Sequence, residues 1–282
     1  MAEYRFRILN VFAIVGDRFS GNPLCVFEDA RGMSDAQMQA LALQFNLSES
    51  TFVFPSEAAT ARVRIFTPMF EMPFAGHPTL GSAHVVRSMT HGGDSITLEM
   101  KAGVIPVTAQ GDTWMLQANA PRIRPVEVTR EQLAQMLAID ASQIAGEPLW
   151  VNAGSEQLVI PLDCAAAVDR CSPNLQLLEK YARVSETRQL AYVWAPLDDD
   201  HITARFFFRN GSSVIEDPAT GSACANLGGW FLAQNIQLPL TRSVSQGRAV
   251  RRPSQLRLHI DANRQIFVSG MVIEVGAGNV TI

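Results

Sequence analysis

The chain contains one motif twice: His77-Pro78-Thr79-Leu80-Gly81-Ser82-Ala83 and, 140 positions later, Asp217-Pro218-Ala219-Thr220-Gly221-Ser222-Ala223. The aromatic strand signal Phe52-Val53-Phe54 stands at the same distance from Tyr192-Val193-Trp194. Each half therefore predicts two strands, a turn of small residues and a helix, in that order. A repeat that keeps the order of its neighbours indicates a duplicated domain.

The repeat predicts an α+β fold with two related domains. The chain has 282 residues, of which 47% are hydrophobic and 18% are charged, which is enough for two cores of ordinary size. The stretch 120–125, Ala-Pro-Arg-Ile-Arg-Pro, is typical of a linker. We expect a first domain over 1–118 and a second over 127–270. The last strand, near 271–282, is expected to return to the first domain.

Local patterns assign the elements within this frame. Ser34 is a good cap for a helix that ends near Phe45. Further helices are predicted from the Gly76-His77-Pro78 turn to about 89, over 130–137 and 173–182, and from Asp217 or Gly221 to 233. Strands are predicted at 7–15, 24–27, 51–54, 63–67, 96–100, 104–108, 113–117, near 149 and 158, and at 191–194, 202–208, 256–260, 265–268 and 271–275.

Charge and cysteine usage exclude several classes of protein. The net charge is -4 and no long basic run is present, which argues against a nucleic-acid partner. No secretory apolar region and no stretch of membrane-spanning length is visible. The four cysteines show no CxxC spacing, which favours reduced structural thiols. We therefore expect a cytoplasmic protein without a membrane partner.

No cofactor or metal is predicted. The run Val275-Gly276-Ala277-Gly278 does not lead from a strand into a helix, so it is not a dinucleotide fingerprint, and no P-loop exists. Neither of the two lysines, Lys101 and Lys180, lies near a plausible phosphate cup for a pyridoxal enzyme. His77, His84 and His91 recur every seven residues, whereas zinc sites on helices favour closer spacing with acidic support.

A duplicated α+β domain is expected to have a cleft between its halves, and such clefts are common ligand sites. Each small-residue turn would bring the start of a helix to that cleft, with free N–H groups and the positive end of a helix dipole. Two such ends would hold a carboxylate or a developing enolate-like anion without a metal. His77, Asp217 and Ser222 would then project toward the same ligand.

Four motifs of the chain are distinctive when taken together: Asn46-Leu47-Ser48-Glu49-Ser50-Thr51, Phe66-Thr67-Pro68, Glu71-Met72-Pro73-Phe74-Ala75-Gly76-His77-Pro78-Thr79-Leu80-Gly81 and Glu216-Asp217-Pro218-Ala219-Thr220-Gly221-Ser222-Ala223. They resemble the phenazine-biosynthesis isomerase family (PhzF-like), which shares the diaminopimelate-epimerase fold. The likeness covers nearly the whole chain, from Asn22-Pro23 through Gln246-Gly247 to the final strands.

The resemblance implies two similar domains, each a curled β-sheet around a central helix, and a homodimer. It implies a cofactor-independent isomerase that moves a proton across a small cyclic hydroxy amino acid of the dihydro-hydroxyanthranilate type. The family's catalytic glutamate corresponds to Glu49, with His77 and Asp217 as polarising or secondary proton-transfer residues. The residues expected to bind the substrate are Ser48, Gly76, Gly221 and Ser222.

Epimerases of this fold use two cysteines, one in each half, as base and acid. In the motif register these thiols would fall near Ala75 and within Pro218–Thr220, where no cysteine stands. Cys224 lies about one turn into the second helix and has no partner in the first half. An amino-acid epimerase or racemase is therefore the alternative, and a catalytically idle metabolite-binding protein is a third hypothesis.

Glu49 is then the best candidate base, because it stands just before the apolar Phe52-Val53-Phe54 strand. Apolar surroundings would raise its pKa and allow it to take and return one proton near neutral pH. Each residue also has a structural interpretation. Glu49 is equally a turn or capping residue, Asp217 and Ser222 are good helix caps, and His77 is a turn residue.

Overall fold

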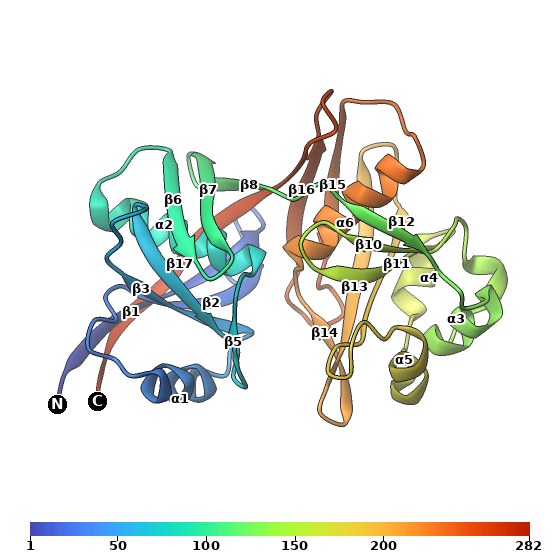
Figure 1. Ribbon diagram of the computed structural model, residues 1–282. Helices are drawn as coiled ribbons and strands as arrows, with labels where there is room; N and C mark the ends of the chain where they lie inside the picture. Colours follow the sequence, from blue (N-terminus) through green and yellow to red (C-terminus); the bar gives the residue numbers. More distant parts are fainter. The chain divides into compact units, whose positions relative to one another are not determined.

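The computed structural model describes all 282 residues, which form two compact units. The first unit consists of Met1–Gln117 and Ser269–Ile282, and the second of Ala118–Val268. The termini lie side by side, because Ala2 and Ile282 exchange two backbone hydrogen bonds of 2.7 and 3.0 Å (Figure 1).

The first unit is a curled sheet whose strands close into a ring. The ring passes through β17 (Ile266–Thr281), β1 (Glu3–Ala13), β2 (Asn22–Phe27), β3 (Glu49–Phe54), β4 (Ala61–Phe66), β6 (Ser95–Met100), β7 (Gly103–Gln110) and β8 (Thr113–Gln117), which pairs again with β17. Most neighbours are antiparallel, while β2–β3 and β4–β6 are parallel. The short strand β5 (Glu71–Met72) pairs with the end of β4.

The helix α2 (Gly76–Thr90) occupies the inside of this ring (Figure 1). It contacts strands on several sides of the ring, among them β1, β3, β6 and β8. A helix that is apolar around most of its circumference must be buried, and Leu80, Ala83 and Val85 are fully buried. At Gly81 any side chain would collide with Leu24, whose Cδ2 atom lies 2.5 Å from the position of a Cβ atom.

The second unit repeats this order. Its strands are β9 (Arg122–Pro125), β10 (Leu149–Asn152), β11 (Glu156–Pro161), β12 (Leu190–Pro196), β13 (His201–Asn210), β14 (Ser213–Asp217), β15 (Leu240–Gln246) and β16 (Ser254–Ile260). The parallel pairs β11–β12 and β13–β15 correspond to β2–β3 and β4–β6 of the first unit. The buried helix α6 (Gly221–Ala233) corresponds to α2.

The remaining helices lie outside the strands that surround α2 and α6. They are α1 (Asp35–Phe45), α3 (Arg130–Leu137), the 3-10 helix η1 (Ala141–Gln143), α4 (Ala165–Arg170) and α5 (Leu175–Tyr181). As predicted, Ser34 caps α1, in a capping box with Gln37. The predicted α+β fold with two similar units, each a curled sheet around a central helix, is confirmed.

Several local predictions are wrong. The expected linker at 120–125 contains β9, which pairs with β10, and the guanidinium of Arg124 lies 4.3 Å from the ring centre of Trp150. The strands predicted at 265–268 and 271–275 are one strand, β17. Asp217 does not start or cap a helix, because it ends β14, and α6 begins at Gly221 after the N-cap Thr220.

The 140-residue offset is also wrong at the central helices. Their first residues, Gly76 and Gly221, are 145 positions apart (221 − 76). The counterpart of His77 is therefore Ser222 and not Asp217. Asp217 pairs with Phe206 on the preceding strand, as Met72 pairs with Ile65 in the first unit.

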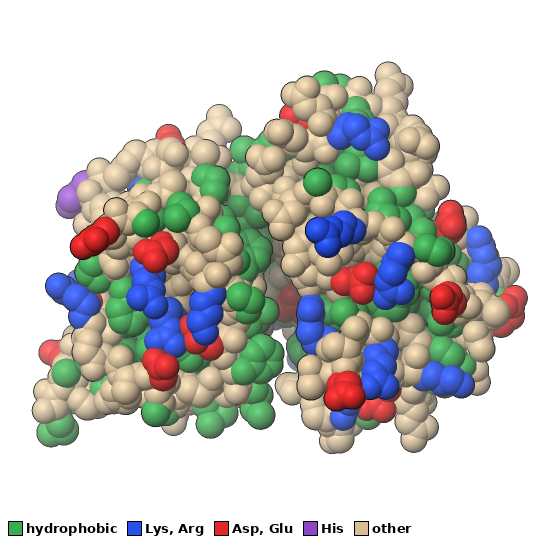
Figure 2. All heavy atoms as spheres, viewed as in Figure 1, with side chains coloured by type: hydrophobic (Ala, Val, Ile, Leu, Met, Phe, Trp, Pro, Cys, Tyr) green, Lys and Arg blue, Asp and Glu red, His purple; other side chains and the backbone are tan.

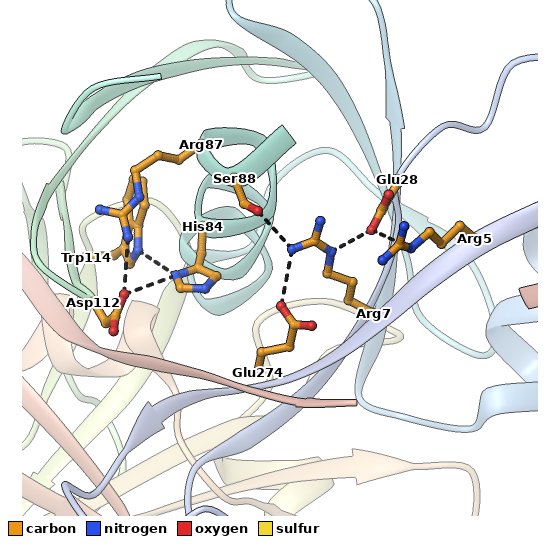
Figure 3. Close-up of polar contacts among 9 residues, drawn as sticks. All are labelled: Arg5, Arg7, Glu28, His84, Arg87, Ser88, Asp112, Trp114 and Glu274. Atoms are coloured by element: carbon orange, nitrogen blue, oxygen red, sulfur yellow. Dashed lines mark hydrogen bonds and ion pairs between the residues drawn. The ribbon is translucent and has the colours of Figure 1, made fainter. Parts of the chain in front are cut away.

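Polar contacts fix the C-terminal half of α2 to the strands around it (Figure 3). The Arg7 guanidinium donates to Ser88 at 3.1 Å and also contacts Glu28 and Glu274. On a neighbouring part of the helix, Trp114 donates to Nδ1 of His84 at 3.2 Å. These contacts hold the helix that carries His77 at its other end.

The surface shown in Figure 2 carries both signs of charge, with Lys and Arg side chains intermingled with Asp and Glu. No helix in the structure combines the length and the apolar character needed to cross a membrane.

Candidate active site

Glu49 is placed by the end of α1 and the start of β3. The helix ends at Phe45, and the left-handed backbone of its C-cap Asn46 (φ 50°) turns the chain, so that β3 begins at Glu49. Asn tolerates this conformation better than most residues. Parallel pairing then sets Glu49 beside Leu24 of β2. The capping interpretation of Glu49 does not apply, since it is a strand residue.

The Glu49 side chain meets His77 of α2. Oε2 of Glu49 lies 3.4 Å from Nε2 of His77, and the two side chains are 15% and 7% exposed. A carboxyl group and an imidazole therefore share a nearly dry site at the start of the buried helix. The structure thus brings together two of the three residues that the resemblance implies for catalysis.

His77 is neutral near pH 7. Burial lowers the pKa of its imidazole from 6.5 to about 3, against the opposing effect of a hydrogen bond to the Pro23 backbone. Pro23 has no backbone N–H, so the imidazole is the donor in this bond. A neutral imidazole has one N–H group. The nitrogen that faces Glu49 therefore carries a lone pair.

The start of α2 offers backbone donors beside this pair. Ala75 is the N-cap and forms no side-chain cap, although Thr79 bonds to the Ala75 carbonyl through its amide (3.2 Å) and its hydroxyl (2.7 Å). The first N–H groups of a helix have no partner within it. Gly76 and His77 carry such groups, and Pro78 has none to lose.

The turn before β2 positions Pro23, the residue whose backbone bonds to His77. Gly21 has a φ of +88°, and a Cβ atom there would lie 2.7 Å from the Val11 carbonyl oxygen. Only glycine fits both the conformation and the space. The turn leads into the fully buried Asn22 and sets Pro23 next to His77.

The second unit has its own polar cluster at the start of α6. Thr220 donates through its hydroxyl to Oδ2 of Asp217 at 2.5 Å. Gln246 donates to the Asp217 carbonyl at 2.8 Å and to the Thr220 hydroxyl at 3.0 Å. Gly247 (φ +81°) follows, and a side chain there would collide with the Pro218 carbonyl oxygen at 2.5 Å. The Asp217 carboxyl group is therefore held in a fixed place.

Ser222 does not cap α6. Its hydroxyl accepts a 2.9 Å hydrogen bond from Gln157 of β11, and Asn226 donates to the same Gln157 at 2.8 Å. Gln157 and Asn226 are almost fully buried. They orient the Ser222 hydroxyl toward β11.

The other expected binding residues are two glycines and a serine. Gly76 and Gly221 occupy equivalent positions, because each is the first residue of a central helix. Ser48 precedes Glu49 in the chain and is half-buried. The roles of Thr220, Gln246 and Gln157 were missed. Thr220 and Gln246 stand within the family motifs, which could have pointed to them, whereas Gln157 has no sequence signal.

The thiols are poorly placed for proton transfer. The resemblance would place a pair of cysteines near Ala75 and within Pro218–Thr220, and Ala75 and Thr220 are the N-caps of the two central helices. Cys224 is fully buried, and burial raises the pKa of its thiol far above the ordinary value. A thiolate is the reactive form of cysteine, so Cys224 is inert near neutral pH.

The architecture is that of the epimerase-type α+β fold. A hydroxyproline epimerase from Agrobacterium vitis superposes with a TM-score of 0.64 at 9% identity, over 99% of this chain and 91% of that one. A PhzF-family phenazine biosynthesis protein from Bacillus anthracis superposes with a TM-score of 0.89 at 23% identity, over 100% of both chains. These two likenesses concern the fold alone.

Residues 10–278 match the family described as phenazine biosynthesis-like protein, PhzC-PhzF. An uncharacterised isomerase of Pasteurella multocida is 37% identical over 100% of this chain and 96% of its own. The trans-2,3-dihydro-3-hydroxyanthranilate isomerase of Pseudomonas aeruginosa is 31% identical over 90% of this chain and 89% of its own. The chain therefore belongs to the PhzC-PhzF family, and the predicted enzyme class, an isomerase, is confirmed.

Proposed function

We propose that this isomerase moves one proton between two carbon atoms of a small cyclic hydroxy amino acid, with Glu49 as the acid and base. A substrate of the trans-2,3-dihydro-3-hydroxyanthranilate type is favoured, because the Pseudomonas aeruginosa relative is named for it. The observation that carries the proposal is the 3.4 Å approach of Glu49 to neutral His77 in a nearly dry site.

A neutral His77 suits a carboxyl group that must be protonated and deprotonated in turn. The lone pair on Nε2 of His77 can accept a hydrogen bond from the protonated form of Glu49. It repels the ionised form, so that form gains little from its neighbour. A neutral His77 therefore favours the protonated form of Glu49, which is the form that returns the proton to the substrate.

The proposed reaction conserves all atoms. The Glu49 carboxylate removes a proton from one ring carbon, and the electron pair of the broken C–H bond enters the conjugated system of the substrate. The N–H groups of Gly76 and His77 stabilise the negative charge that develops there. Glu49 then returns the proton to a second ring carbon, and an isomer leaves with the enzyme unchanged.

The second unit would bind and polarise the substrate, and it would not supply a second group that carries the proton. We propose that Asp217 polarises the substrate or assists proton transfer. Ser222, Gly221, Gly76 and Ser48 would bind its polar groups. The Asp217 carboxylate already accepts the Thr220 hydroxyl at 2.5 Å, which stabilises its ionised form. The homodimer and the cytoplasmic location stay predictions.

The test is exchange of substrate hydrogen with deuterated water during turnover of trans-2,3-dihydro-3-hydroxyanthranilate. The wild-type protein is expected to introduce deuterium at one ring carbon and to form the isomer. Glu49→Gln is expected to lower both rates by about 1,000-fold or more, since it removes the proton carrier. Mass spectrometry of the product gives the deuterium content.

The control is Glu57→Gln, which makes the same change at an exposed glutamate of the same unit and should leave both rates unaltered. Thermal unfolding of the two variants checks that they fold. Turnover by folded Glu49→Gln at the wild-type rate would disprove the role of Glu49.

A further inference from the structure

The second unit carries a cation, Arg188, two residues before the position that corresponds to the proposed base of the first unit. Phe52 of β3 pairs with Arg64, and Val193 of β12 pairs with Arg205. Arg64 and Arg205 are counterparts, because each binds a glutamate five residues before a central helix, Glu71 or Glu216. Counting back three residues from Phe52 and from Val193 shows that Leu190 corresponds to Glu49. Arg188, two residues earlier, corresponds to Leu47.

A hydrogen bond fixes Arg188 beside the start of β11, the strand that also bonds to Ser222. Its Nη2 donates to the Ser155 hydroxyl at 2.6 Å. Ser155 precedes β11, and its carbonyl accepts from Asn226 at 2.8 Å. Gln157 follows two residues later and bonds to Ser222. Ser155 directly precedes β11 and Gln157 lies within it. In extended backbone, residues two apart lie about 7 Å from each other, which is close to the length of a six-membered ring with its substituents.

The Arg188 guanidinium has no carboxylate of its own. Its hydrogen bond goes to a neutral hydroxyl, and Glu156, which attracts it from a distance, is already bound by two 3.0 Å hydrogen bonds from Arg124. Arg188 is exposed to solvent, and partial desolvation lowers the pKa of its guanidinium. An accessible guanidinium without a paired carboxylate can form charge-assisted hydrogen bonds with an anionic ligand.

We propose that Arg188, fixed by Ser155, forms a carboxylate-binding subsite in the second unit that recognises the acidic group of a small ring-shaped ligand. This subsite depends on the proposed function in one respect, namely that the ring-shaped ligand is the substrate of the isomerase. Arginine suits this role, since its planar fork matches the two oxygens of a carboxylate.

The test uses two stable probes that differ in one group, 2-aminobenzoate with a charged carboxylate and 2-aminobenzamide with a neutral carboxamide, and binding is measured by titration calorimetry. The wild-type protein is expected to prefer the acid. Arg188→Gln should raise the Kd for 2-aminobenzoate about tenfold or more and change that for the amide less than about twofold. Arg188→Lys should lie between them.

Arg183→Gln is the control, because it removes an exposed arginine from the other end of the same loop, and it should leave both Kd values unchanged. Unfolding curves exclude a folding defect. The subsite is disproved if the wild-type protein does not bind 2-aminobenzoate, if Arg188→Gln leaves its Kd within twofold, or if both probes weaken equally. Because no turnover is involved, these outcomes are separate from failure of the isomerase proposal, which the Glu49→Gln exchange experiment decides.

Discussion

The two units share the order of their strands and helices but carry different side chains at equivalent places. The first has Glu49 at the start of β3 and His77 at the second position of α2, whereas the second has Leu190 and Ser222 there. The second unit instead fixes Asp217 at the end of β14, where the first has Met72. Duplication therefore preserved the scaffold and the helix ends, while only one unit kept a carboxyl group beside an imidazole.

This difference favours a single proton carrier over a symmetric pair of bases. In a symmetric epimerase the two units would bring equivalent groups to the substrate. Here the equivalent N-caps are Ala75 and Thr220, neither of which exchanges protons near neutral pH.

The two equivalent ion pairs, Arg64–Glu71 and Arg205–Glu216, should contribute different amounts to the free energy of unfolding. Arg205 is bound to Glu216, whose side chain is 7% exposed, and also donates to the Val168, Asp169 and Cys171 carbonyls. Arg205→Met leaves Glu216 buried and unpaired, so we expect a loss of about 3 kcal/mol or more in the free energy of unfolding. Urea denaturation gives this value.

The matched variant in the first unit is Arg64→Met. Glu71 keeps its 2.6 Å ion pair with Lys101 and is more exposed, so the expected loss is only about 1 kcal/mol. Equal losses for the two variants would show that the surroundings of the pair do not control its strength.

Asp217→Asn should lower kcat/KM by about 10- to 100-fold, less than Glu49→Gln does, because Asp217 assists and does not carry the proton. Asparagine can still accept the Thr220 hydroxyl, so the geometry of the cluster is kept. Asp199→Asn, at an exposed position of the same unit, is the control in the kinetic assay. A loss as large as that of Glu49→Gln would mean that both units supply an essential carboxylate.

The buried imidazole of the first unit should make stability depend on pH. The unfolded chain binds a proton at His77 near pH 6.5, but the folded protein does so only near pH 3. Between these values the unfolded state holds the additional proton, so stability falls as the pH falls. The slope contributed by His77 is at most about 1.4 kcal/mol per pH unit.

Denaturant unfolding at pH 7 and pH 5 measures this slope. His77→Asn is expected to reduce it, whereas His91→Asn, at an exposed position with a left-handed backbone that asparagine tolerates, should not. An unchanged slope in His77→Asn would show that His77 is charged in the folded protein.

Much of the fold could be predicted because its strongest signals are local. The apolar strands around Phe52 and Val193 and the capped helix after Ser34 follow from pattern and propensity. The short strands β5 and β14 could not be recognised, since they are defined by pairing with β4 and β13. The stretch 122–125 has the composition of a linker, yet tertiary pairing with β10 makes it a strand.

The candidate site was predictable in part. Glu49 and His77 came from motifs of the family, and their contact depends on a turn and a parallel strand that no local pattern reveals. The register of the second motif was wrong because Gly-Ser-Ala occurs at both 81–83 and 221–223, although α2 is already in its second turn at Gly81 while α6 begins at Gly221. Arg188 carries no motif and is recognised only through the equivalence of the two units.

The central claim is that one carboxyl group both removes and returns the proton. The most direct measurement follows a substrate deuterated at the donating carbon through a single turnover in ordinary water. If Glu49 carries the proton, part of the deuterium will appear at the accepting carbon of the product, because return competes with exchange to solvent. Product with ordinary hydrogen alone at that carbon, even at the shortest reaction times, would contradict a single carrier.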